Sequence, residues 1–147
     1  MKKQIITLAL IPALLLSSCA NVNDQAIITA IGGGTSLALQ FGVKDSARRT
    51  VIANYINVYA GALRTISGSP TAVQLVGLLN QAVPASVRAD FPELTTFVYP
   101  LIISGYQLAQ KQFGTNAAKI YQWANDTAVG LENGSAAYIS GPITVSP

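Results

Sequence analysis

The sequence contains no histidine, a single cysteine and few charged residues, although half of its 147 residues are hydrophobic. Without histidine it lacks the imidazole base of Ser-His-Asp and Cys-His catalysis and the commonest ligand of catalytic zinc sites. A single cysteine cannot form a disulfide within the chain. Charged residues make up only 10% of the sequence, and so little charge with so much apolar content excludes a disordered chain. The length predicts one domain.

The first 18 residues are typical of a secretory signal peptide. Lys2 and Lys3 precede residues 5–16, an apolar stretch without a charge. About 12 residues are too few for a permanent membrane-spanning helix, which needs about 20. A basic start, a short apolar region and small residues after it predict export and removal of this segment.

The segment ends in Leu16-Ser17-Ser18-Cys19, and here the sequence resembles the bacterial lipoprotein precursors. The lipobox of that family is an aliphatic residue, two small residues and a cysteine. The resemblance implies cleavage between Ser18 and Cys19, and attachment of diacylglycerol and a fatty acyl group such as palmitate to Cys19. Ala20 follows the cysteine where Asp would favour retention, which in a Gram-negative cell implies the periplasmic face of the outer membrane. The resemblance covers about the first 20 residues and identifies no family for the remainder.

Cleavage changes the charge balance of the chain. The net charge of +3 comes from nine basic and six acidic residues, and two of the basic residues are Lys2 and Lys3. The mature chain is therefore nearly neutral, and its one basic cluster is Arg48-Arg49 beside Lys44. Because phosphate-backbone binding needs several clustered cations, we expect no nucleic-acid partner. We expect the membrane as a partner instead, since several acyl chains anchor a protein stably without a spanning helix.

Residues 26–43 form the most unusual segment. No charged residue occurs between Asp24 and Lys44, and three consecutive glycines begin at Gly32. Two interpretations stay open: close packing against a helix in the bilayer or in an oligomer, or a first bundle helix or helix pair with a flexible joint at the glycines. Small residues at every fourth position form the candidate helix-packing ridge, namely Ala26, Ala30, Gly34, Ala38 and Gly42.

Two amphipathic helices are predicted next, from apolar residues at three- and four-residue spacing. Asp45 can cap the first, and Ser69 can cap the second, with Pro70 in its first turn. The second helix stops at Pro84, and residues 85–92 form a connector with about one helical turn. The expected buried face of the first helix is Ala47, Val51, Tyr55, Val58, Tyr59, Ala62 and Ile66.

Two more helices follow the connector. Residues 93–113 keep the helical spacing, Pro100 predicts a kink within them, and Gly114 closes the helix. Thr115 can cap the last helix, whose periodicity fades at Ser135. The sequence therefore predicts an all-α fold, a small bundle of about four amphipathic helices with a short extended tail. The expected divisions are a signal peptide at 1–18, a lipidated tether at 19–25, the helical domain at 26–134, and an extended or loosely ordered tail at 135–147.

No pattern of residues predicts catalysis. Asp90 and Glu93 are close in sequence but flank Phe91-Pro92, where we expect them to cap a helix rather than act as acid and base. There is no metal-ligand spacing and no nucleophile elbow. We therefore expect no catalytic residue, no metal and no enzyme activity, and no cofactor beyond the covalent lipid on Cys19.

The expected function is that of an envelope lipoprotein with a structural or protein-interaction role near the bilayer, through another envelope protein or through self-association. Two alternatives stay open. The first is a membrane-active or pore-forming protein of the lysis or exclusion type, using residues 26–43. The second is a carrier of an apolar ligand between the helices.

Overall fold

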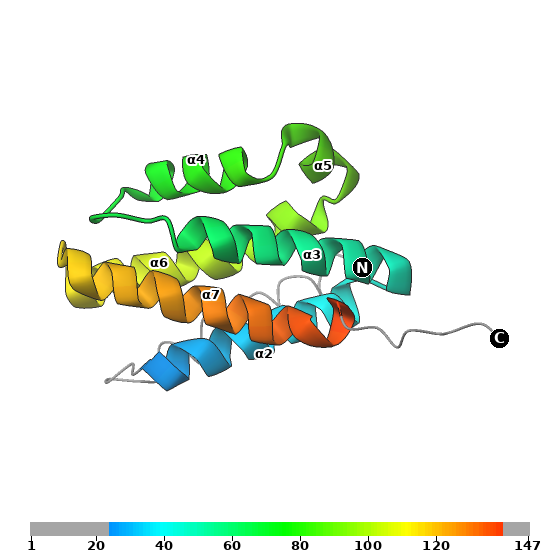
Figure 1. The fold of residues 1–147 in the computed structure, drawn as a ribbon, viewed down its shortest axis with the longest axis horizontal. Coiled ribbons are helices and arrows are strands. Elements are labelled where there is room, and N and C mark those ends of the chain that lie inside the picture. Colours follow the sequence, from blue (N-terminus) through cyan, green and yellow to red (C-terminus); the bar gives the residue numbers. More distant parts are fainter. Residues whose placement is uncertain (1–23, 140–147) are drawn as a thin grey trace, which may run out of the picture.

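A computed structural model describes residues 24–139 as an all-α bundle without strands, which confirms the expected fold class (Figure 1). The predicted signal peptide with Ser18 and Cys19, and residues 140–147 of the predicted tail, lie outside the described residues. Five helices are longer than ten residues, one more than the four expected. The elements are α2 (Asp24–Gly42), α3 (Ser46–Leu63), α4 (Ala72–Ala82), α5 (Ala85–Asp90), the π-helical turn η1 (Leu94–Val98), α6 (Tyr99–Phe113) and α7 (Ala117–Ile139).

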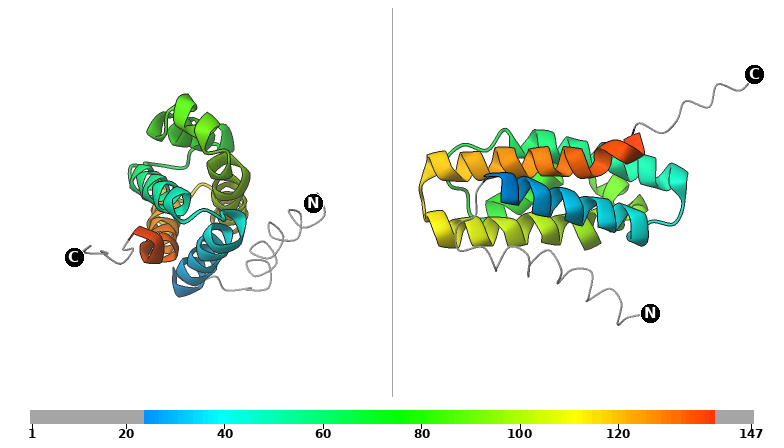
Figure 2. Two further views of the ribbon diagram at one scale, coloured as in Figure 1. Left: turned by 90° about the vertical axis from the view of Figure 1, so that its right-hand side faces the viewer. Right: turned by 90° about the horizontal axis from the view of Figure 1, so that it is seen from below.

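Helix α7 makes the most extensive packing contacts in the described bundle. It lies between α2 and α3 and packs against both, while α6 covers a further side (Figures 1 and 2). Helix α4 packs on α3 and α6 at one edge of the bundle, and α2 forms the opposite edge. One continuous hydrophobic core joins all of these helices, with fully buried side chains such as Ile31, Ile56, Leu79, Ile102 and Leu131.

Helix α2 runs unbroken through Gly32-Gly33-Gly34, so it has no flexible joint and is the first helix of the bundle. Each glycine costs an isolated helix about 1 kcal/mol relative to alanine, so packing must hold this helix together. Its buried residues follow a three- and four-residue spacing on the side that faces α7: Ile27, Ile31, Gly32, Thr35 and Leu39.

Helix α3 begins as predicted but buries a different face. Asp45 caps it, because its side chain accepts a hydrogen bond of 2.7 Å from the N–H of Arg48. The predicted buried face is wrong in part, since Val51 and Val58 are 37% and 42% exposed. Helix α7 covers one side of α3, and α4 and η1 cover another. The buried face of α3 is therefore shifted by about one residue from the predicted face. The residues buried on α3 are Ile52, Ala53, Ile56, Tyr59, Ala60 and Leu63.

Helix α4 begins two residues later than predicted. Thr71, not Ser69, is its cap, and Thr71 and Gln74 form a reciprocal capping box. After α4, the short helix α5 supplies the single turn expected in the connector.

Pro100 lies in the first turn of α6, directly after an irregular turn. Just before Pro100 the chain forms the π-helical turn η1, in which the N–H of Tyr99 bonds to the carbonyl of Leu94. A proline clashes with the carbonyl four residues earlier in a regular helix, and a wider turn relieves that clash. Gly114 ends α6 as predicted, with a φ of 59° that favours glycine.

Helix α7 continues past the predicted start of the tail. The side chain of Asn116, not Thr115, accepts a hydrogen bond from the helix start at Lys119. Ser135–Ile139 is helical, so the prediction that an extended or loosely ordered tail begins at Ser135 is wrong for these five residues. Tertiary contacts hold this last part: the hydroxyl of Ser135 lies 3.0 Å from the Asn57 side chain, and the Tyr138 hydroxyl donates to α2.

Candidate functional site

Helices α2 and α7 approach each other closely through glycines. A Cβ added to Gly134 would lie 2.6 Å from the Cβ of Thr35 and closer still to the carbonyl oxygen of Gly32. A Cβ added to Gly130 would lie 2.9 Å from the carbonyl oxygen of Ile28. Because real side chains do not approach so closely, only glycine permits this contact. We call Gly32, Gly130 and Gly134 the glycine seam.

The glycine seam differs from the ridge predicted on α2. Gly32 contacts α7, whereas Gly34 and the other ridge residues are half-buried beside the seam. Gly42 meets the ring of Phe97, which lies 2.9 Å from the position of a Cβ. The spacing Gly130-x-x-x-Gly134 in the last predicted helix is a sequence signal of close helix packing, but it does not identify α2 as the partner.

The side of α2 that faces away from α7 is uncharged and partly apolar. Gly33, Leu37 and Phe41 are one helical turn apart, so they lie one above the other on this side. Leu37 is 39% exposed and Phe41 is 62% exposed, and Thr29 and Gln40 are exposed beside them. We call Thr29, Gly33, Leu37, Gln40 and Phe41 the outer face of α2. Among the helices that the structure describes, none has both the length and the apolar content needed to span a membrane.

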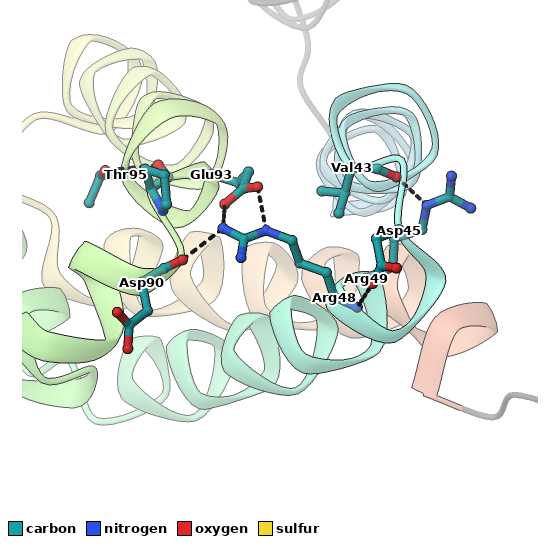
Figure 3. Close-up of polar contacts among 8 residues, drawn as sticks. Val43, Asp45, Arg48, Arg49, Asp90, Glu93 and Thr95 are labelled. Atoms are coloured by element: carbon teal, nitrogen blue, oxygen red, sulfur yellow. Dashed lines mark hydrogen bonds and ion pairs between the residues drawn. The ribbon is translucent and has the colours of Figure 1, made fainter.

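Arg48 ties α3 to the turn between α5 and η1 (Figure 3). Its guanidinium donates two hydrogen bonds of 2.8 Å to the carboxylate of Glu93 and one of 2.7 Å to the carbonyl of Asp90. It also lies 4.7 Å from the centre of the Phe91 ring. The hydrogen bonds from Arg48 lower the pKa of Glu93 below its ordinary value. The expectation that Asp90 and Glu93 cap a helix is wrong, because Glu93 makes no capping bond and binds Arg48.

Arg49 closes the end of α2. Its guanidinium donates a hydrogen bond to the backbone carbonyl of Val43 (Figure 3). It also donates to the backbone carbonyls of Gln40 and Lys44. Carbonyls at the C-terminal end of a helix lack partners within the helix, and a cation there also interacts favourably with the helix dipole. Both arginines of the basic cluster noted in the sequence therefore make hydrogen bonds within the bundle.

A pair of carboxylates lies at the start of α2. Gln122 of α7 donates a hydrogen bond of 2.6 Å to Asp24, and Asp126 lies one turn further along α7. Burial, then the charge of Asp24, raises the pKa of Asp126 to about 6. No sequence pattern indicates this pair, because about 100 residues separate its members and only the fold brings them together.

The raised pKa of Asp126 predicts that the free energy of unfolding falls as the pH rises. A raised pKa means that the folded chain binds the Asp126 proton more tightly than the unfolded chain does. The stabilisation that this proton gives the fold is therefore complete below about pH 4 and is lost as the pH rises through about 6. We expect Asp126→Asn to match the parent near pH 4 and to exceed its free energy of unfolding by roughly 1 to 2 kcal/mol at neutral pH, after allowance for solvent screening. Urea unfolding at both pH values measures this. Parallel curves for the two proteins would contradict the assignment.

Two small apolar hollows lie between helices in the described part of the chain. Ile27, Gly105 and Trp123 line one of them, and Leu39, Ile52 and Phe97 line the other. Each has room for about one water molecule, far less than an apolar ligand needs. Their side chains therefore belong to the packing of the bundle.

No cluster of three or more potential metal ligands occurs in residues 24–139. No family model matches the chain, and comparisons with curated proteins and with solved structures found no match.

Proposed function

We propose that this chain is a lipid-anchored envelope protein whose helical domain has a structural or protein-interaction role beside the outer membrane, on its periplasmic face. The observation that carries the proposal is the position of Cys19. It is the only cysteine in the chain and stands where the lipobox requires one, at the end of a signal-peptide-like segment.

The distance from the anchor to the fold supports the proposal. Helix α2 begins at Asp24, five residues after Cys19, and five residues span at most about 18 Å. The folded domain therefore stays within reach of lipid headgroups and of membrane proteins beside it. Such tethering raises the effective concentration of nearby partners, so weak contacts suffice for association.

The surface of the bundle offers faces for such contacts. The outer face of α2 is one, and Val51 and Val58, two turns apart on α3, form part of a second. Val73 on α4 is 81% exposed at the edge farthest from α2. An envelope protein, or a second copy, could therefore bind on one side while the lipid anchor holds another side near the membrane.

Fatty-acid labelling of exporting cells tests the proposal. The parent chain should incorporate a labelled fatty acid and run at the size of a processed protein. Cys19→Ala should incorporate none and remain at precursor size, because the acceptor sulfur and the cleavage signal are both lost. The matched control is Ser18→Ala, which keeps a small residue before the cysteine and should be labelled like the parent. Labelling of Cys19→Ala would contradict the proposal.

A further inference from the structure

The outer face of α2 is uncharged and presents two exposed apolar side chains, Leu37 and Phe41. It carries no charge over the length of the helix beyond the first residue, Asp24. Phe41 is 62% exposed, the second most exposed of the large hydrophobic side chains in the described residues. Ile27, Ile31 and Leu39 of α2 are buried, so the outer face can meet a surface without any change in the bundle.

The length of chain before α2 indicates which surface that is. Cys19 is five residues before the helix, so the start of α2 stays within about 18 Å of the predicted acyl chains. Phe41 is 17 residues beyond Asp24, which is about 26 Å along the helix. A helix that points away from the membrane would carry Leu37 and Phe41 far into water. A helix that lies along the membrane brings its whole outer face to the interface.

The arrangement of the bundle permits this orientation. Helix α2 forms one edge, and α4 forms the opposite edge, so no described helix stands between the outer face of α2 and its surroundings (Figures 1 and 2). Lys44 is exposed just past the end of α2, where an ammonium group can contact anionic headgroups. The tether keeps the concentration of lipid at this face high, so a modest affinity suffices to orient the domain.

We propose that the outer face of α2 lies flat on the bilayer surface and sets the orientation of the anchored domain, with Phe41 and Leu37 at the level of the headgroups. This proposal rests on the lipid anchor proposed above. It assigns the partner of this face as phospholipid rather than a second copy of the chain or another protein.

Spin labels on the lipidated, full mature protein test this orientation. The Phe41→Cys variant is purified from membranes as the mature protein, labelled with a nitroxide at the introduced thiol, and reconstituted into vesicles of phosphatidylethanolamine and phosphatidylglycerol. Val73→Cys on α4 provides the matched control, because it also replaces an exposed apolar residue on a helix. Leu37→Cys provides a second position on the outer face. Circular dichroism confirms that each variant keeps the helical fold.

We expect the labels at positions 37 and 41 to be several-fold more accessible to oxygen than to a water-soluble nickel chelate, relative to the label at position 73. Equal accessibility at positions 41 and 73 on vesicle-bound protein would overturn the inference and leave the lipid anchor intact. Spin–spin broadening at position 41 that disappears on dilution with unlabelled protein would also overturn it, since a second copy would then occupy the face. A second nitroxide on Cys19 would show a free thiol there, and would overturn the proposed function together with this inference.

Discussion

Replacing Gly134 by alanine will destabilise the bundle severely, although alanine is the better helix former. The added methyl group would overlap the carbonyl oxygen of Gly32 and the Cβ of Thr35, which are a backbone atom and a first side-chain atom of α2. Neither atom can rotate away, so α2 must move off α7 along the longest contact in the bundle. We expect a loss of about 3 kcal/mol in the free energy of unfolding, and a fall in Tm on the order of 10 °C.

The matched control is Gly33→Ala, one residue from the glycine seam. A Cβ at Gly33 meets no atom within 4 Å among the described residues, and the position is an exposed part of a helix. We expect this variant to gain about 0.5 to 1 kcal/mol from helix propensity. The same substitution should therefore change stability in opposite directions at the two positions, as measured by urea unfolding of the mature protein. If Gly134→Ala were as stable as the parent, the close contact of α2 with α7 would be contradicted.

Replacing Ala20 by aspartate will move the protein to another membrane in a Gram-negative host. The proposed sorting depends on the residue that follows the lipidated cysteine, and an aspartate there resembles the pattern of lipoproteins that stay in the inner membrane. Because Cys19 is unchanged, fatty-acid labelling and cleavage should continue as in the parent. In a density gradient, we expect most of the Ala20→Asp protein in the inner-membrane fraction and most of the parent in the outer-membrane fraction.

Ala20→Ser is the control for that experiment, since it changes the same position without the acidic group and should leave the protein in the outer membrane. Both substitutions lie before Asp24, outside the described helices, so the stability of the bundle should not change. A lipidated Ala20→Asp protein that remains in the outer membrane would contradict the proposed sorting.

The helical architecture could be predicted because its signals are local. Asp45 before α3 and Gly114 after α6 act on their own helix ends, and the structure has both where the sequence indicates them. The errors arise where distant parts of the chain meet. The end of α7 looks like a tail because glycine and serine are poor helix formers, yet Gly134 and Ser135 are buried against α2 and α3. Packing thus overrides the local preference.

The packed and exposed faces of α2 also depend on contacts between distant parts of the chain. The composition of α2 leaves close helix packing and a first bundle helix with a flexible joint both open. Only the fold shows that Gly32 faces Gly130 and Gly134 while Leu37 and Phe41 face outward. If the buried face of a helix is assigned one residue too early or too late, buried and exposed neighbours change places. The spacing of apolar residues alone does not decide between these assignments. The contacts of Arg48 with Glu93 and of Gln122 with Asp24 join residues far apart in sequence, so no local pattern indicates them.

The central claim is that Cys19 is the lipidated first residue of the mature protein. Mass spectrometry of the N-terminal peptide, released by protease from protein purified out of the outer membrane, tests this most directly. We expect a peptide that begins at Cys19 and carries the added mass of a diacylglycerol and a fatty acyl group. A peptide that begins at another residue, or one with an unmodified Cys19 thiol, would contradict it.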